Sequence, residues 1–120
     1  MIPKFRAYDE ETETMFDVLG FDLDDNEIWS YDQSYELNKC KIMQSTGLKD
    51  RNSVEIYEGD IIEWRYVITH VDSSQQGNLG MSIGFYAQRD DFESYHMLDV
   101  GDEYEVLGNI YENPELLEVE

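Results

Sequence analysis

The amino-acid sequence predicts a mainly β fold: a small, strongly bent sheet or a partly open β-barrel of about seven short strands, with a short helical turn near the C-terminus. Three observations predict it. Short segments alternate polar and apolar residues, these segments are rich in β-branched and aromatic residues, and turn-forming residues separate them. The 120 residues, 41% of them hydrophobic, fit a single domain, residues 1–120, with a packed core.

Seven segments carry the strand pattern. In chain order they are residues 4–8, 14–19, 27–31, 41–46, 61–71, 82–87 and 103–110. The segment 61–71 is the longest and is dense in Ile, Val, Tyr and Trp, which pack well on a pleated, half-buried surface, so we expect a central strand there. Near the end of the chain, Asn113 and Pro114 are typical of an N-cap and a first helical position, and the few residues after them allow a turn or two of helix.

Two glycine-containing turns are expected to shape the sheet. The segment 57–60 precedes an apolar strand, so Gly59 should supply a positive φ or a close backbone approach. Gly108-Asn109 interrupts a strand pattern and predicts a β-bulge or a strand end. At Asn52-Ser53, a two-residue hairpin turn of the primed type would need a positive φ at both positions.

Four blocks of sequence, taken together and in order, resemble the YopX family. They are Phe5–Asp9, Ile42–Asp50, Glu55–Ile62 and Glu105–Leu117. The chain departs from the family pattern where Tyr8 replaces a usual Trp, Ser45 a common aromatic residue and Ser53 a usual glycine. The resemblance implies a small phage- or prophage-encoded protein of Gram-positive bacteria, mostly β and without an assigned biochemical function. Within the blocks, we expect a structural role for the turn residues Gly47, Gly59, Asp60, Gly108, Asn109 and Pro114.

The net charge restricts the partners. Against 28 acidic residues stand only 8 basic ones, a formal charge of −20, and residues 7–38 hold eleven acids without a Lys or Arg. Such a surface repels phosphate backbones and anionic lipids, so we expect no direct nucleic-acid binding and a basic protein as any charged partner. Runs of like charge are also typical of solvated loops. The candidate acidic interaction surface comprises Asp22, Asp24, Asp25, Asp102, Glu103 and Glu105.

The sequence predicts no catalytic, cofactor or metal site, and hence no enzyme. Cys40 has lysines on both sides but no nearby His to activate it. His70 and His96 lack the spacing of a zinc site. A loop beginning at Asp22 starts like an EF-hand but lacks the glycine at position 6 and the glutamate at position 12.

Three functional hypotheses stay open, and the third, an enzyme, would need an ordered ligand or metal in a concave pocket to support it. The first is an accessory interaction protein that forms a homo-oligomer and binds a basic host or phage protein, because Tyr and Trp are abundant and are favoured at interfaces. The second is an acidic nucleic-acid mimic that blocks a basic host nucleic-acid-binding protein. Glu103 and Glu105 support it, since two residues apart on a strand they would lie about 6.8 Å apart on one face. With one cysteine, no signal-peptide pattern and no apolar run that could cross a bilayer, the expected location is the bacterial cytoplasm, away from membranes.

Overall fold

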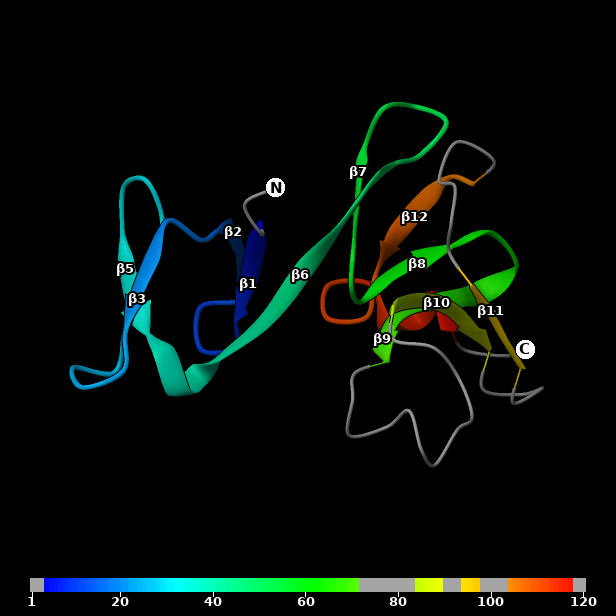
Figure 1. The fold of residues 1–120 in the computed structure, drawn as a ribbon. Coiled ribbons are helices and arrows are strands. Elements are labelled where there is room, and N and C mark those ends of the chain that lie inside the picture. The colour runs from blue at the N-terminus through cyan, green and yellow to red at the C-terminus, as the bar shows by residue number, and fades with distance from the viewer. Residues whose placement is uncertain (1–3, 72–83, 90–93, 98–103, 118–120) are drawn as a thin grey trace. The chain divides into compact units, whose positions relative to one another are not determined.

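The computed structural model describes residues 4–71, 84–89, 94–97 and 104–117 (Figure 1). Within these ranges the protein is mainly β, with twelve strands and three 3-10 turns. The predicted fold class is therefore confirmed, although the strands are shorter and more numerous than the predicted seven. The chain divides into two compact units, Met1–Ser45 and Thr46–Glu120, each described by itself below. The single domain expected from the chain length stays a prediction.

The amino-terminal unit contains two antiparallel arrangements of strands. Its elements are β1 (Phe5–Asp9), β2 (Thr14–Asp17), β3 (Gly20–Asp22), β4 (Glu27–Trp29), β5 (Ser34–Glu36), the 3-10 turn η1 (Leu37–Lys39) and the first part of β6 (Cys40–Lys49). Strand β1 pairs with β2 on one side and β6 on the other, while β3, β4 and β5 form a separate three-stranded sheet. Ala7, Phe16 and Ile28 form its buried core, and the rings of Phe16 and Tyr35 stack with centroids 4.3 Å apart.

The carboxy-terminal unit is built on a five-stranded antiparallel sheet. Its elements after β6 are β7 (Glu55–Tyr57), β8 (Asp60–Ile62), η2 (Glu63–Arg65), β9 (Tyr66–Val71), β10 (Gly84–Arg89), β11 (Ser94–Met97), β12 (Val106–Asn109) and η3 (Pro114–Leu117). The strand order is β11-β10-β9-β8-β12, and the sheet is strongly curled (Figure 1). Its buried core comprises Ile56, Ile62, Ile68 and Ala87.

The long central strand predicted over residues 61–71 is wrong, because this segment folds into a hairpin. Strands β8 and β9 pair with each other, Ile61 opposite Val67 and Ile62 opposite Tyr66. The 3-10 turn between them contains Arg65 in the left-handed region, at φ 63°. Both halves pack against the same core, and the turn between them, Glu63–Arg65, contains no Gly, Pro, Asn or Asp that would mark it in the sequence.

The other six predicted strands overlap with β1, β2, β4, β6, β10 and β12, but residues 18–19, 30–31, 104–105 and 110 of the predicted ranges are not in strands; residues 82–83 and 103 lie outside the described residues. The strands that the sequence pattern did not predict, β3, β5, β7 and β11, have only three or four residues each. The helical turn at Pro114 is confirmed as η3. No helix in the described part of the chain is long and apolar enough to span a membrane.

The turn at Asn52-Ser53 differs from the predicted primed type. The amide of Ser53 donates to the carbonyl of Asp50 at 3.0 Å, and the amide of Asp50 to the carbonyl of Val54 at 2.8 Å. Ser53 has a positive φ of 66° and Asn52 does not. The geometry is that of a three-residue loop in which one left-handed residue follows a tight turn.

Candidate functional site

Three of the predicted acidic residues lie together in the turn between β3 and β4. Asp22, Asp24 and Asp25 are all exposed. The Oδ1 atom of Asp22 accepts hydrogen bonds from the amides of Asp24 at 3.0 Å and Asp25 at 3.3 Å, so one carboxylate fixes the turn that presents the other two. Asn26 completes the turn with a φ of 54°. The structure thus brings together half of the predicted acidic surface.

Strand register adds a row of carboxylates that the sequence did not reveal. Asp22 lies opposite Glu27 on β4, and Glu27 lies opposite Glu36 on β5. Residues directly opposite each other point to the same face with Cβ atoms about 5 Å apart, so this acid row places three negative charges side by side. Like charges in that arrangement are destabilising by up to about 1 kcal/mol per pair in water. A cation placed on the row would relieve this repulsion.

An open groove of about 360 Å³ adjoins the acid row. Five carboxylates line it, together with five uncharged residues: Asp9, Glu11, Asp25, Glu27, Glu36, Thr12, Asn26, Gln33, Ser34 and Tyr35. We call it the acidic groove. Its lining comes from three separate segments of the chain, residues 9–12, 25–27 and 33–36. No spacing motif predicts such a groove.

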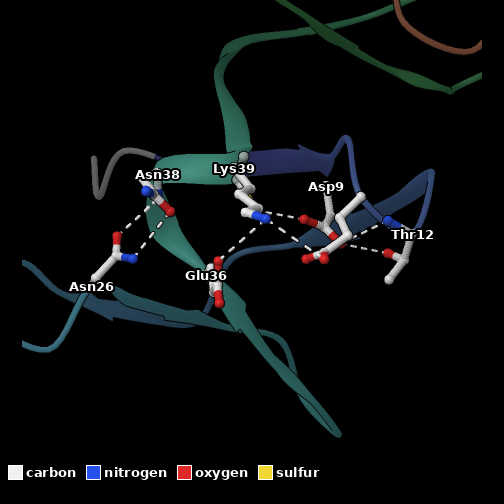
Figure 2. Close-up of polar contacts among 8 residues, drawn as sticks. Asp9, Thr12, Asn26, Glu36, Asn38 and Lys39 are labelled. Atoms are coloured by element: carbon white, nitrogen blue, oxygen red, sulfur yellow. Dashed lines mark hydrogen bonds and ion pairs between the residues drawn. The ribbon is translucent and has the colours of Figure 1, made fainter.

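The fold around the acidic groove is fixed by short polar contacts. The Asn26 side chain accepts from the amide of Asn38 at 2.9 Å and donates to the Asn38 side chain at 3.0 Å, tying the β3–β4 turn to η1 (Figure 2). The Lys39 ammonium lies 3.7 Å from the Glu36 carboxylate (Figure 2) and 3.6 Å from that of Glu11. The contacts of Lys39 demonstrate that an ammonium group fits between acids from β5 and from the β1–β2 turn.

Asp9 is the buried member of the groove lining, with 2% exposure. Burial raises its pKa, but hydrogen bonds to its carboxylate from the hydroxyl and amide of Thr12 and from the Cys40 thiol outweigh this effect and leave the pKa lowered. Asp9 therefore stays ionised and holds the β1–β2 turn.

The same carboxylate determines the state of Cys40. Burial and the charge of Asp9, whose Oδ1 atom lies 3.7 Å from the Cys40 sulfur, raise the pKa of the thiol to about 11. The flanking Lys39 and Lys41 point to acids instead, and Lys41 pairs with Glu10 at 3.7 Å. A thiol with a pKa this high is protonated at neutral pH, which weakens it as a nucleophile.

The second half of the predicted acidic surface is only partly described. Asp102 and Glu103 lie outside the described residues. Glu105 is half-buried and precedes β12 rather than lying in it. The predicted pairing of Glu103 with Glu105 on one strand face stays a prediction.

The turn residues of the carboxy-terminal unit have structural contacts. Gly59 has a φ of 87°, and its amide and carbonyl bond to Ile68 at 2.8 Å and to Ile110 at 3.0 Å, which confirms the expected positive φ. Asp60 is 1% exposed and accepts from the amide of Tyr57 at 2.7 Å. The β-bulge expected at Gly108 is confirmed by the register shift between Val106 and Gly108.

Asn109 and Asn113 organise the chain reversal after β12. The Asn109 side chain accepts from the amides of Tyr111 at 3.1 Å and Glu112 at 2.9 Å. Asn113, expected to cap the helical turn, directs its Oδ1 atom back to the amide of Asn109 at 3.1 Å, while its backbone carbonyl accepts from Leu116 at 3.1 Å. A side chain on Gly108 would collide with Asn113, since its Cβ would lie 2.5 Å from that Oδ1 atom.

Asp50 is the polar residue whose role the sequence did not reveal. It is only 4% exposed, and its carboxylate accepts from the amides of Asn52 at 2.8 Å, Val54 at 2.9 Å and Val106 at 2.9 Å. Burial raises its pKa, but these three hydrogen bonds outweigh burial and lower it. Asp50 therefore joins the β6–β7 hairpin to β12.

The histidines are not brought together by the strand register. His70 packs on the ring of Phe85, with centroids 4.8 Å apart. On β11, His96 lies opposite Ala87 of β10, which lies opposite Ile68 of β9, so a strand separates it from His70. Within residues 4–71, 84–89, 94–97 and 104–117, no group of three metal-binding side chains is close enough to hold an ion.

Comparisons with known proteins agree with the four-block resemblance. The family model described as YopX protein matches residues 4–118. A crystal structure of protein EF1440 from Enterococcus faecalis is similar, with 31% sequence identity over 98% of this chain and 99% of that chain and a TM-score of 0.63. No curated protein matches the chain.

Proposed function

Because this chain belongs to the YopX family, we propose that it is a phage- or prophage-encoded accessory protein of the bacterial cytoplasm that acts by binding other proteins. The acidic groove of the amino-terminal unit is where a basic partner binds. The groove itself carries this proposal: all ten of its described lining residues are acidic or uncharged, and five are carboxylates.

The chemistry of the groove favours lysine or arginine side chains over a compact metal ion. Its volume of about 360 Å³ exceeds that of a single ion, and its carboxylates come from three separate segments. Lys39 already bridges Glu11 and Glu36 at the groove, so a partner's ammonium or guanidinium group would make the same kind of contact. Such contacts between exposed charges weaken as salt screens them.

A binding assay with a cationic probe tests this proposal. Fluorescein-labelled decalysine should bind the protein at 0.05 M NaCl, as followed by fluorescence anisotropy. The triple variant Asp25→Asn, Glu27→Gln, Glu36→Gln should bind it at least fivefold more weakly.

A second triple variant provides the matched control for net charge. The variant Glu115→Gln, Glu118→Gln, Glu120→Gln removes an equal number of negative charges near the C-terminus. It should change the affinity for decalysine less than twofold. Equal losses in the two triple variants would show that decalysine responds to net charge alone, and the groove proposal would then fail.

We also propose self-assembly, as the abundance of aromatic residues suggests. In support, the large apolar or aromatic side chains of Tyr31, Ile42, Val54 and Leu107 are between 45% and 93% exposed. Repulsion between copies that each carry a net charge of −20 should oppose assembly at low salt. The measured mass should therefore rise as the NaCl concentration increases. Multi-angle light scattering at micromolar concentration in 0.15 M NaCl measures it, and a mass of 14.1 kDa would exclude this part of the proposal.

Nucleic-acid mimicry is the alternative proposal, in which the basic partner is a nucleic-acid-binding protein. The acid row supports it. Asp22, Glu27 and Glu36 carry charges at steps of about 5 Å, which is of the same order as the phosphate spacing along one DNA strand. A mimic requires that duplex DNA does not bind the protein but displaces a partner captured from host lysate. A partner that duplex DNA does not displace would exclude mimicry and leave the interaction proposal intact.

A further inference from the structure

The outer edge of the three-stranded sheet exposes apolar side chains. Strand β3 is an edge strand, with β4 as its hydrogen-bonded neighbour within the described residues. Leu19, Phe21 and Leu23, at alternate positions along and just beyond β3, are 63%, 54% and 75% exposed. We call these three residues the apolar row. Strand β4 covers only one side of it.

The strand register shows that Phe21, the central residue of the apolar row, lies on the same face of the sheet as buried core residues. Phe21 lies opposite Ile28, which is fully buried, and Ile28 lies opposite Tyr35, whose ring stacks on Phe16. Phe21 therefore continues the core-facing side of the sheet, but among the residues that the structure describes no strand lies beyond it to complete its burial. An added strand at this edge would cover it with the side chains of that same face.

The opposite face of the same edge is acidic. Alternate residues of a strand point to opposite faces, so Asp22 lies on the face away from Phe21, at the head of the acid row. Asp17, Asp24 and Asp25 nearby are also exposed, and residues 7–38 contain no Lys or Arg. A second copy would bring the same acids to this edge. Charge complementarity favours a basic occupant instead.

We propose that β3 binds an extended segment of a partner protein in which apolar residues alternate with lysine or arginine. Added as a fourth strand, such a segment places its apolar side chains beside Phe21 and its cations beside Asp22, because both strands have a period of two residues. The proposal rests on the proposed function and specifies the partner's chemistry: a basic, alternating strand that pairs at β3 next to the acidic groove.

Labelled ten-residue peptides test this proposal by fluorescence anisotropy on the full chain. A peptide alternating Lys and Val should bind at least tenfold more tightly than one alternating Lys and Ser, which has the same charge. Phe21→Ser and Leu23→Ser should each bring the affinity for the Lys–Val peptide to within about threefold of that for the Lys–Ser peptide. Leu23 lies in the turn, so Leu23→Ser tests the row even if Phe21→Ser unfolds the sheet.

Val54→Ser is the matched control, because Val54 is an exposed apolar residue of the other unit, at 48% exposure. It should leave both affinities within twofold. The proposal is overturned if the two peptides bind alike, if Val54→Ser causes the same loss as Leu23→Ser, or if light scattering shows that Leu23→Ser converts an oligomer to a monomer, which would make a second copy the occupant.

The test separates this proposal from the one on which it rests. If the Lys–Ser and Lys–Val peptides bind equally and both lose affinity in the groove triple variant, the acidic groove binds basic partners but the apolar row does not contribute. If neither peptide binds at low salt, the proposed function fails, and the strand proposal fails with it.

Discussion

Asp50 and Asp24 are both turn aspartates, but they lie in contrasting surroundings in the two units. In the carboxy-terminal unit, Asp50 is 4% exposed and accepts three backbone hydrogen bonds. In the amino-terminal unit, Asp24 is exposed in a turn that the neighbouring Asp22 holds. The comparison shows that a buried carboxylate with three backbone donors stabilises the fold, whereas an exposed carboxylate such as Asp24 remains available to a partner.

The amino-terminal unit contains one carboxylate of the stabilising kind. Asp9 is 2% exposed and holds Thr12, as Asp50 holds its own hairpin. It lines the acidic groove beside exposed acids such as Glu11 and Glu36. Burial, rather than position in the chain, separates the two roles.

The largest expected effect is that of Asp50→Asn. An asparagine has one acceptor oxygen, and its amide group would face backbone donors that are buried with it, so at least one donor loses its partner. We expect a loss of about 3 kcal/mol in the free energy of unfolding, measured by urea titration. Asp24→Asn is the matched control and should change it by less than about 0.5 kcal/mol. Equal effects would remove the distinction between the two units.

Lowering the pH should show the same distinction between buried and exposed carboxylates. The pKa values of Asp50 and Asp9 are lowered in the folded state, so their stabilisation is complete above the unfolded-state pKa, about 3.9, and is lost as the pH falls through the folded-state values. The advantage of the wild type over Asp50→Asn in free energy of unfolding should therefore shrink as the pH falls below about 4. Parallel pH curves for the two proteins would contradict the assignment to Asp50.

Two glycines give a smaller and equally direct comparison. A Cβ on Gly108 would lie 2.5 Å from the Asn113 Oδ1 atom, which the Asn109 amide needs, so Gly108→Ala should cost about 2 kcal/mol. A Cβ on Gly20 would lie 2.5 Å from the ring of Trp29, which is half-buried. Gly20→Ala should therefore cost less than about 1 kcal/mol in the same urea titration. The reverse order would show that the Trp29 ring is held more firmly than the Asn113 side chain.

The smallest expected effect is a gain of stability at two left-handed residues. Ser53 and Glu13, one in each unit, have φ values of 66° and 56°. Ser53→Gly and Glu13→Gly should each stabilise the protein by roughly 0.5–1 kcal/mol, because glycine adopts this conformation without strain. Thermal unfolding measures both, and a loss of stability in either would show that its side chain has contacts that outweigh the strain.

The sequence predicted those parts of the fold that depend on the conformational preferences of a few adjacent residues. Gly59 and Gly108 could be recognised because a positive φ and a β-bulge each select glycine locally. The hairpin of β8 and β9 could not, because Arg65 carries no mark of a left-handed turn and both flanking strands are apolar. Strands of three residues, such as β3 and β5, are too short to show alternation.

The site was predictable only as a region of charge. The acids of the β3–β4 turn are adjacent in the sequence, so Asp22, Asp24 and Asp25 could be grouped at once. Glu27 and Glu36 join them only through strand register, and Asp9 and Glu11 only through the packing of another turn. Asp50 was missed because a polar residue in a turn is normally exposed, and one of its three donors, the amide of Val106, is far along the chain.

The most direct test of the central claim compares one groove variant with one buried variant in two measurements. The triple variant Asp25→Asn, Glu27→Gln, Glu36→Gln and the single variant Asp50→Asn are each assayed for decalysine affinity at 0.05 M NaCl and for the free energy of unfolding in urea. We expect the triple variant to lose at least fivefold in affinity with no loss of stability, and Asp50→Asn to lose about 3 kcal/mol of stability with its affinity unchanged below the unfolding transition. A triple variant that loses stability but keeps its affinity would contradict the claim that the exposed acids of the amino-terminal unit bind a partner.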